Sequence, residues 1–311
     1  MKPFVVEPLA VVRVWGGHRL ADWGRCAEGG DPVGESWEVH GSQPVRGANC
    51  SLDDLCRQHG AEILGQWCRQ PQAGFPLLTK WLDCQDWLSI QVHPDDSVAS
   101  QVEGPGHRGK AEAWYFAEVQ PQAEVIHGWK HGCPSRDQLM QLKGSSWSDL
   151  VHRYRPDPQS WSYTAPGTVH ALGPGLLVFE VQQSSDLTYR LYDWGRMGLD
   201  GQPRPLHGPQ GVMAICDSLS EAAVTPPDDL LGKIEILSPH FVIESVVGDR
   251  EWTPAGRSVE LLTALQAPAT LDYLGDSWIL GAGDSLVLPA QLGDVRMRSS
   301  GPWLRVRLGP L

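Results

Sequence analysis

Short runs in which apolar and polar residues alternate recur along the whole chain, and they constrain the fold more than any other feature. Residues 34–40 and 188–194 alternate in this way, and 232–311 contains one such run after another. A period of two residues is that of a half-buried β-strand. The 34 glycines and 25 prolines supply the tight turns that many short strands require. The sequence therefore predicts a mainly β fold.

Two stretches interrupt this pattern with helical character. Ser51 and Asp54 have the spacing of a capping box and precede apolar residues, so we expect helix near 51–68. A second helical insertion is expected near 133–155, where serines again precede apolar residues at helical spacing.

The chain is longer than a usual single domain, and its composition indicates where it divides. Residues 200–230 contain clusters of Pro, Gly and Asp that are typical of a connector. We therefore expect a first domain over 1–225, which holds both helical segments, and a second, all-β domain over 226–311.

Charge and cysteine usage limit the partners. The 25 basic and 37 acidic residues give a net charge of −12, which opposes binding to nucleic acid or to an anionic membrane. We expect neither a membrane span nor a signal peptide, because no apolar run is long enough and Met1–Phe4 leads directly into a strand. Seven scattered cysteines without a C-x-x-C pair indicate a reducing compartment, so we expect a cytoplasmic protein. A monomer is expected, although the oligomeric state is left open.

The strand within Leu88–Asp96 carries the first candidate site residues. Successive side chains point to opposite faces, so Ser89, Gln91 and His93 share a polar face opposite an apolar one. Gln91 offers a carbonyl oxygen and His93 an imidazole nitrogen, and both are suitable ligands for Zn²⁺. Alone, such a pair is more often structural than metal-binding.

Two further strands bring more candidate ligands. Glu112 lies in the alternating run 109–116, and His170 lies just after a Pro-Gly turn, where a β-barrel places ligands at its mouth. Each residue taken singly is better explained as structural, and for Glu112 the ordinary interpretation is a solvated ion pair. Together with Gln91 and His93 they form an N₂O₂ set that leaves a position open, as a catalytic zinc requires. We therefore predict one Zn²⁺ per chain.

Charged residues within apolar strands indicate an anionic substrate. Lys80, Lys110 and Arg190 place positive charge on strands of an acidic protein, which suits a phosphate or a carboxylate. Lys80 could equally be an edge-strand lysine that prevents aggregation. Glu180 is the one charge in the apolar run 176–182.

A repeated sequence pattern indicates that one barrel has been duplicated. Residues 283–293 repeat the pattern of 161–170, a strand that reaches a turn of Pro and a small residue. Aligning Pro289 with Pro166 places Gly293 at the position of His170. We therefore expect a duplicated barrel in which only the first copy binds metal.

Several of these motifs in combination resemble type I mannose-6-phosphate isomerases, most closely the short bacterial form. The resemblance covers most of the chain and is weak after about residue 200. The motifs that carry it are Gln91–Asp96, Gly109–Glu112, Pro166–Ala171 and Gln182–Arg190, together with Trp15–Gly17 and Gly34–Glu38 near the start.

The resemblance implies a cupin (jelly-roll) metalloenzyme, and the internal repeat indicates that the chain contains two such barrels. It also implies that Arg190 is a catalytic arginine, that Lys80 and Lys110 are lysines of the substrate site, and that Glu180 is a family acid. One departure is visible: the longer enteric and fungal enzymes have a His-Lys-Pro-Glu run where this chain has Gly109–Glu112. A base role for that extra histidine cannot apply here. The zinc ligands implied by the resemblance are Gln91, His93, Glu112 and His170.

The implied reaction is the interconversion of mannose 6-phosphate and fructose 6-phosphate through a metal-stabilised enediol. Arg190 or Lys110 would stabilise the developing oxyanion, and Glu180 would be the base, because burial among apolar residues raises a carboxyl pKa. Lys80 and Ser89 are expected to bind substrate, Lys80 at the phosphate. A hydride shift is the rival mechanism. The alternative functions are a non-catalytic sugar-binding cupin and an isomerase of an unphosphorylated sugar.

Overall fold

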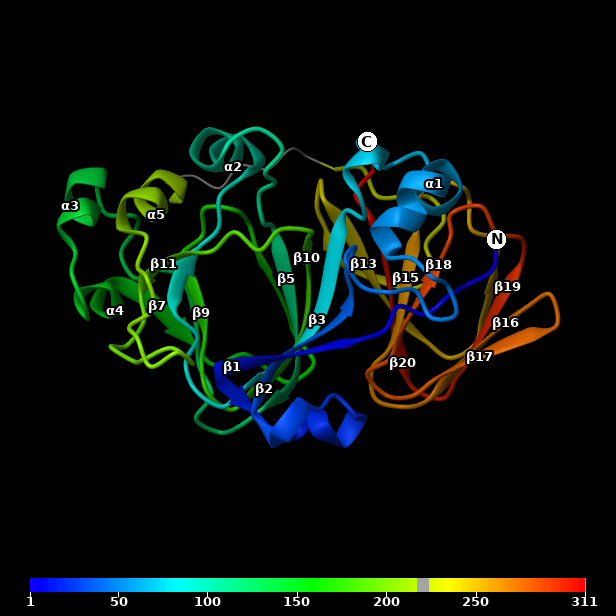
Figure 1. The fold of residues 1–311 in the computed structure, drawn as a ribbon, viewed down its shortest axis with the longest axis horizontal. Helices are drawn as coiled ribbons and strands as arrows, with labels where there is room; N and C mark the ends of the chain where they lie inside the picture. Colours follow the sequence, from blue (N-terminus) through cyan, green and yellow to red (C-terminus); the bar gives the residue numbers. More distant parts are fainter. Residues whose placement is uncertain (217–223, 311) are drawn as a thin grey trace. The chain divides into compact units, whose positions relative to one another are not determined.

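The computed structural model describes residues 1–216 and 224–310, and its contacts divide the chain into two compact units (Figure 1). Unit 1 contains Met1–Leu9, Glu38–Leu78 and the described residues after 223, and unit 2 contains Ala10–Trp37 and 79–216. Two N-terminal segments are thus grouped with the C-terminal strands. The domain boundary near 225 stays a prediction, and residues 217–223 of the predicted connector lie outside the described residues.

Unit 2 is built around two packed sheets. The six-stranded sheet has the order β1 (Leu9–Gly17), β2 (Val33–Val39), β3 (Leu77–Cys84), β10 (Leu176–Gln183), β5 (Glu112–Val119) and β8 (Trp161–Thr164). The five-stranded sheet has the order β11 (Tyr189–Tyr192), β4 (Ile90–Val92), β9 (His170–Leu172), β6 (Val125–Trp129) and β7 (Val151–Tyr154). The predicted mainly β, cupin-type fold is confirmed as pairs of sheets.

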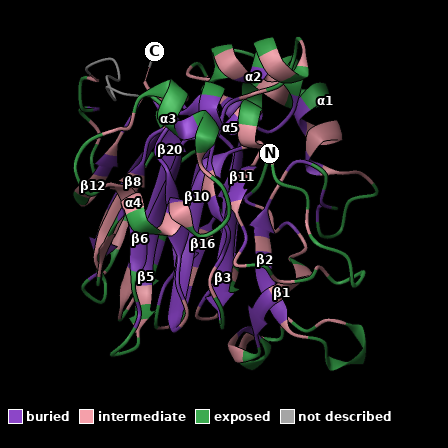
Figure 2. Ribbon diagram, turned by 90° about the vertical axis from the view of Figure 1, so that its left-hand side faces the viewer, coloured by how far each residue is buried: buried purple, intermediate pink, exposed green. Residues whose placement is uncertain are grey.

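Alternation along these strands produces two apolar layers in unit 2. Trp114 and Val178 of one sheet pack with Val125 and Leu172 of the other, which forms the core between the sheets. On the opposite face of the five-stranded sheet, Ile90 and its apolar neighbours form a second core. The helices α3, α4 and α5 lie beside this sheet (Figure 1). The strands are largely buried, while exposed residues gather in helices and loops (Figure 2).

Helices occur in both predicted stretches. The helix α1 (Leu52–Leu64) begins with the expected capping box, in which the Asp54 amide donates to Ser51 Oγ at 3.1 Å. Within 133–155 the structure has α3 (Arg136–Gln141) and α4 (Ser146–Leu150). The short 3-10 helices are η1 (Arg19–Trp23), η2 (Glu28–Gly30) and η3 (Pro71–Ala73).

Two other helices were not predicted. The helix α2 (Asp96–Glu103) forms because Asp95 caps it, accepting from the Val98 amide at 2.7 Å. The helix α5 (Gly208–Ala214) begins with a Pro near its first turn, inside the predicted connector. No helix among the described residues is long and apolar enough to cross a membrane.

Unit 1 also contains two sheets. One has the order β12 (Lys233–Leu237), β13 (Phe241–Val247), β20 (Pro302–Leu308), β15 (Glu260–Ala264) and β18 (Ser285–Leu288). The other has the order β14 (Arg250–Trp252), β19 (Val295–Ser299), β16 (Ala269–Tyr273) and β17 (Asp276–Leu280).

The two units repeat one strand order. The orders β3-β10-β5-β8 and β4-β9-β6-β7 of unit 2 recur in unit 1 as β13-β20-β15-β18 and β14-β19-β16-β17. Strand β8 corresponds to β18, and these are the strands that the repeated sequence pattern had matched. The topology therefore supports the predicted duplication.

Candidate metal centre

Three of the four predicted ligands converge between the two sheets of unit 2. Glu112 begins β5, His170 begins β9, and His93 follows β4. Each is only 1% exposed. One potential ligand atom from each lies within 4.8 Å of the others, so the group could hold a metal ion. It is the only such cluster of three or more residues in the described part of the chain.

Strand register lines up further side chains beside these ligands. Paired residues of an antiparallel ladder point to the same face. We call one line of residues across β11, β4, β9 and β6 the histidine row, which consists of Arg190, Gln91, His170 and His127. We call the line across β10, β5 and β8 in the other sheet the glutamate row, which consists of Gln182, Glu112 and Thr164.

Backbone carbonyls fix the tautomers of both ligand histidines. His93 Nδ1 lies 2.8 Å from the Leu187 carbonyl oxygen, and His170 Nδ1 lies 2.9 Å from that of Thr168. A carbonyl only accepts, so each Nδ1 carries the proton and each Nε2 carries a lone pair. Carboxylate oxygens of Glu112 face these lone pairs, at 3.1 Å for His170 and 3.3 Å for His93. Facing lone pairs repel unless a cation lies among them.

A lysine ammonium contacts part of this group. Lys110 Nζ lies 2.8 Å from Glu112 Oε2 and 3.0 Å from His93 Nε2. The other oxygen, Glu112 Oε1, is buried and accepts no hydrogen bond from any described residue. The donor set, two imidazole lone pairs and one carboxylate, is the chemistry that Zn²⁺ selects. These residues therefore fit the predicted metal.

The electrostatics favour the protonation states that bind metal. Burial lowers the pKa of His170 to about 3 despite the attraction of Glu112, and burial followed by Lys110 lowers the pKa of His93. Burial alone would raise the pKa of Glu112, but Lys110 and the two histidines bring it well below its usual value. Neutral imidazoles and an ionised carboxylate need to release no proton when they bind a cation.

Gln91, the fourth predicted ligand, lies next to His170 in the histidine row. Its Nε2 lies 3.1 Å from His170 Nε2, and its Oε1 accepts from Ser89 Oγ at 3.1 Å. The amide thus presents nitrogen towards the imidazole, and a half-turn of the amide would present oxygen instead. Ligation by Gln91 stays a prediction, and Ser89 contacts it directly.

Lys80 lies in a buried network of charges. It is 7% exposed, and its Nζ lies 2.9 Å from Glu180 Oε1 and 3.7 Å from Glu35 Oε2. Arg13 also binds Glu35, at 2.9 Å. The edge-strand interpretation of Lys80 is wrong, because β3 lies between β2 and β10 inside its sheet. Burial opposes the charge, but Glu180 and Glu35 raise the pKa of Lys80.

Glu180 is paired, whereas its apolar sequence context indicated an isolated carboxylate. Besides contacting Lys80, it accepts a hydrogen bond from Trp114 Nε1 at 3.0 Å. The Trp114 ring centroid lies 5.4 Å from that of His170. Trp114 therefore links the carboxylate to the metal ligands, and the role of Glu180 as a base stays a prediction.

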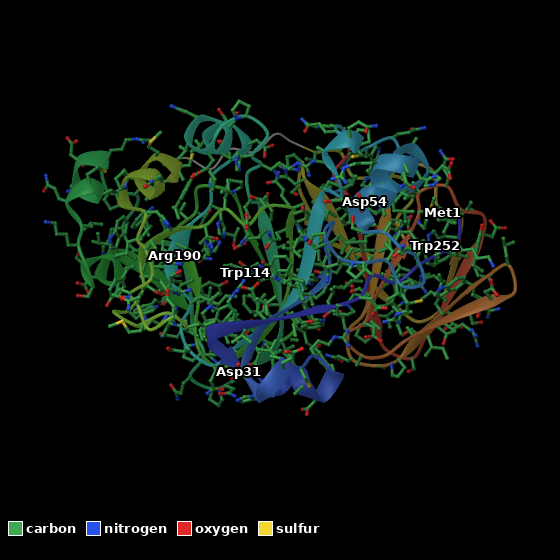
Figure 3. All side chains as sticks on the ribbon, viewed as in Figure 1. Met1, Asp31, Asp54, Trp114, Arg190 and Trp252 are labelled. Atoms are coloured by element: carbon green, nitrogen blue, oxygen red, sulfur yellow. The ribbon has the colours of Figure 1, made fainter. Side chains whose placement is uncertain are left out.

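Arg190 has a side chain that is available to bind an anion. Its backbone amide donates to His207 Nδ1 at 3.1 Å, but its guanidinium has no ion pair or hydrogen bond with any described residue. By contrast, Arg196 and Arg204 both bind Asp193. Burial, followed by Arg204, lowers the pKa of Arg190. Figure 3 labels Arg190 and Trp114 within unit 2.

Four residues of this region were not predicted from the sequence. Arg13 and Glu35 extend the charge network, and His127 and Thr164 end the two rows. Glu35 and Thr164 lie in alternating runs, so their faces could have been inferred, whereas the run Val125–Trp129 around His127 does not alternate. The neighbours of all four residues could not be inferred, because they depend on which strands pair.

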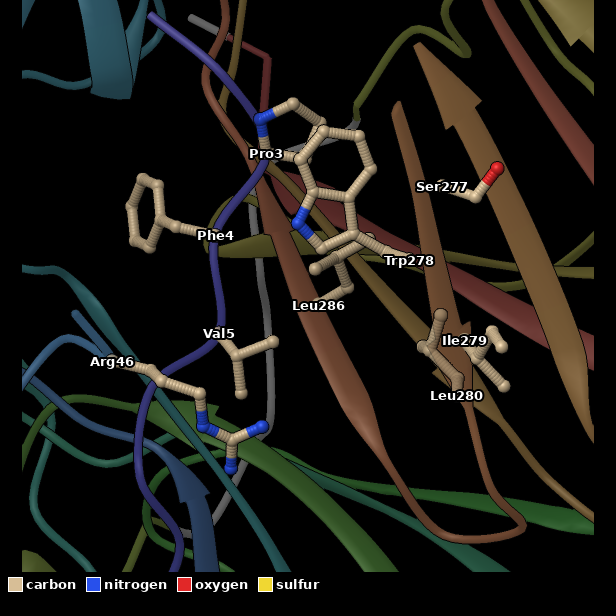
Figure 4. Close-up of a pocket in the computed structure, with 9 residues that line it drawn as sticks. All are labelled: Pro3, Phe4, Val5, Arg46, Ser277, Trp278, Ile279, Leu280 and Leu286. Carbon is tan, nitrogen blue, oxygen red and sulfur yellow. The ribbon is translucent and has the colours of Figure 1, made fainter. Parts of the chain in front are cut away.

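Unit 1 has a separate pocket of about 330 Å³ (Figure 4). Residues 3–5 line one side, and Trp278 and Leu280 line another. The charged lining residue, Arg46, is bound to Glu7 at 2.6 Å. Because the Arg46 charge is already paired with Glu7, this mainly apolar pocket does not indicate which ligand could bind there.

Paired antiparallel sheets around a buried His–Glu–His group define a cupin-type protein with a metal-binding centre. Comparison with known proteins gives the family. The family described as "Phosphomannose isomerase type I, catalytic domain" matches residues 13–118. The probable mannose-6-phosphate isomerase GmuF of Bacillus subtilis is 34% identical over 306 residues, covering 94% of this chain and 95% of that protein. The chain therefore belongs to the type I mannose-6-phosphate isomerase family, a family of isomerases.

Solved structures agree. The crystal structure of the mannose 6-phosphate isomerase from Bacillus subtilis has a TM-score of 0.85 and 28% identity, covering 98% of this chain and 99% of that one. A zinc-bound mannose 6-phosphate isomerase shares the fold, with a TM-score of 0.75 at 16% identity, covering 99% of this chain and 100% of that one. The non-catalytic alternative is not favoured.

Proposed function

We propose that this chain interconverts mannose 6-phosphate and fructose 6-phosphate with one bound Zn²⁺. The observation that carries the proposal is the buried group of His93, Glu112 and His170, in a chain similar over its length to a probable mannose-6-phosphate isomerase. We propose these three residues as zinc ligands, with Gln91 as the fourth after its amide turns. A bound zinc ion supplies a Lewis acid for the oxygens on the reacting carbons.

Arg190 was expected to be a catalytic arginine and Lys80 to bind the phosphate; we propose instead that Arg190 binds the phosphate. Lys80 is already neutralised by two carboxylates, whereas the Arg190 guanidinium is free among the described residues. Arg190 stands two strands from His170 in the histidine row, roughly 10 Å at the usual strand spacing. A phosphorylated six-carbon chain has about the length to join these positions.

The charges of this region also suit a phosphorylated sugar. The cations outnumber the carboxylates by one before any metal is counted, which favours a dianion. The cations are Arg13, Lys80, Lys110 and Arg190, and the carboxylates are Glu35, Glu112 and Glu180.

The reaction needs a proton carried from C2 to C1 while a hydrogen moves from O2 to O1. We propose Glu180 as the carrier of the carbon-bound proton, since Trp114 ties it to the ligand group. Lys110 contacts Glu112 and would stabilise the negative charge that develops on the sugar oxygens.

The test is a coupled assay for fructose 6-phosphate, run on chelator-stripped protein and again after adding Zn²⁺. We expect activity to disappear and return with the metal. Arg190→Gln should lower kcat/KM for mannose 6-phosphate about 10- to 100-fold, the range for losing a charged hydrogen bond. Turnover of unphosphorylated mannose, if any is measured, should not fall with it. Zinc-loaded protein without turnover of mannose 6-phosphate would overturn the proposal.

We also propose a cytoplasmic location. None of the seven cysteines, all of them among the described residues, forms a disulfide, which supports a reducing compartment. A monomer stays a prediction, which analytical ultracentrifugation would test.

A further inference from the structure

Two buried oxygens lie on either side of Glu112 in the glutamate row and lack hydrogen-bond partners. Gln182 is opposite Glu112 on β10, and Thr164 is opposite it on β8. Their side chains are 0% and 1% exposed. Gln182 Oε1 and Thr164 Oγ1 have no partner among the described residues. Buried polar atoms are nearly always hydrogen-bonded in proteins, so these two call for an explanation.

The orientation of the Gln182 amide is fixed by its own nitrogen. Nε2 donates to the carbonyl oxygens of Gln183 at 2.9 Å and of Ser185 at 2.6 Å. Turning the amide over would place its oxygen against those two carbonyls, which is repulsive. Gln182 Oε1 is therefore an acceptor held in place without a donor.

Thr164 offers a second oxygen at the same level of the sheet. Directly paired residues place their Cβ atoms about 4.5–5.5 Å apart, so Gln182 and Thr164 both adjoin the Glu112 side chain. Neither oxygen belongs to the predicted ligand set. Both oxygens require a hydrogen-bond donor that binds beside Glu112, and a sugar hydroxyl is such a donor.

We propose that Gln182 and Thr164 accept hydrogen bonds from hydroxyls of the open-chain sugar, one on each side of Glu112. This inference rests on the proposed function and deepens it, because it names residues that recognise a polyol next to the reacting carbons. Arg190 would hold the phosphate, and these two residues would orient the chain between phosphate and metal.

The same sheet offers a matched control. Thr79 on β3 is also fully buried with an unpartnered Oγ1, but it alternates with Lys80 and so faces away from the glutamate row. Thr164→Val and Thr79→Val each remove one buried hydroxyl from this sheet without changing the side-chain shape. Only the first should change binding of a polyol.

The experiment is calorimetric binding of mannitol 6-phosphate, an alditol that cannot isomerise, to the zinc-loaded protein. Thr164→Val should weaken binding about 3- to 10-fold, the range for one neutral hydrogen bond, while Thr79→Val changes it less than twofold. Equal effects in both variants would overturn the role of Thr164.

Gln182 is tested with the 2-, 3-, 4- and 5-deoxy derivatives of mannitol 6-phosphate. In the wild-type protein one derivative should bind about 3- to 10-fold more weakly than the parent because it lacks the hydroxyl that Gln182 accepts. In Gln182→Met that ratio should fall to about one. The ratio is independent of the fraction of folded protein, so partial unfolding of the variant does not confuse it. An unchanged ratio would overturn the role of Gln182.

The two proposals fail differently. Wild-type turnover of mannose 6-phosphate with unaffected variants would remove the inference and leave the proposed function intact. Binding of mannitol 6-phosphate that depends on Gln182 and Thr164, without turnover, would keep the inference and remove the isomerase. Absence of binding to the wild-type protein would overturn the inference outright.

Discussion

Replacing Lys80 by Met should destabilise the fold by about 3–5 kcal/mol, because it leaves a buried carboxylate without its cation. Glu35 keeps Arg13, at 2.9 Å, and the Trp37 indole, at 2.7 Å. Among the described residues, Glu180 keeps only the Trp114 indole, at 3.0 Å. The cost is therefore that of one stranded carboxylate and not of two.

Urea denaturation with linear extrapolation measures this loss, and the slope should not change. The double variant Lys80→Met/Glu180→Gln removes the stranded charge and should recover more than half of the lost stability. Lys143→Met, at an exposed lysine of the same unit, should cost less than about 1 kcal/mol. A loss below about 1 kcal/mol in Lys80→Met, or a double variant no more stable than the single one, would refute the ion-pair assignment. If Lys80 served only to bind phosphate, the double variant would be no more stable than Lys80→Met alone.

Two further predictions concern carboxylates of the same network. Burial acts to raise the pKa of Glu35, but Lys80 and Arg13 lower it to about 2, from 4.5. Since the folded-state pKa is depressed, the stabilisation is complete above about pH 4.5 and is lost as the pH falls towards 2, by roughly 3 kcal/mol. Acid titration of the urea midpoint should show this loss, and Glu35→Gln should reduce it; an unchanged profile would contradict the assignment. Glu180→Gln should abolish exchange of the C2 proton with deuterated solvent during turnover, and retained exchange would remove Glu180 from the role of base.

Local alternation in the sequence was enough to predict which faces carry the site. Ser89, Gln91 and His93 were expected on one face and Ile90 in a core. The structure has Ile90 buried beneath helices and His93 in the buried group that could hold a metal ion. A strand permits this inference because its side-chain period does not depend on its partners.

What depends on pairing could not be predicted. Gln182, Glu112 and Thr164 adjoin one another only because β5 lies between β10 and β8. Similarly, Lys80 and Glu180 are one hundred positions apart, so the sequence presented two isolated charges where the structure has one pair. An unusual charge can be recognised in the sequence, but its partner is known only once the pairing and register of the strands are known.

The duplicated topology explains why one copy would bind metal and the other would not. Glu112 begins β5, and Glu260 begins the corresponding strand β15. Gln182 lies opposite Glu112, and Arg307 lies opposite Glu260. Both copies thus bury a carboxylate at the same point of the same strand order.

The second copy supplies its cation from the chain. Arg305, two residues before Arg307, binds Glu260 through two guanidinium nitrogens, with Nε at 2.8 Å from Oε2. Glu244 accepts from Arg307 at 2.8 Å and from Arg305 at 3.3 Å. All these residues are at most 1% exposed, so the charges are compensated within the unit.

A buried carboxylate requires a positive partner in either copy, because its desolvation is otherwise too costly. In unit 1 a guanidinium fills this need permanently, and no metal is then required. In unit 2 the position of Arg305 is held by Glu180, and two histidine lone pairs face Glu112 instead. An exchangeable cation can satisfy that arrangement, and it retains coordination positions for substrate that a guanidinium lacks. The same strand order therefore gives a buried ion-pair network in one copy and, in the other, a buried group that could hold a metal ion.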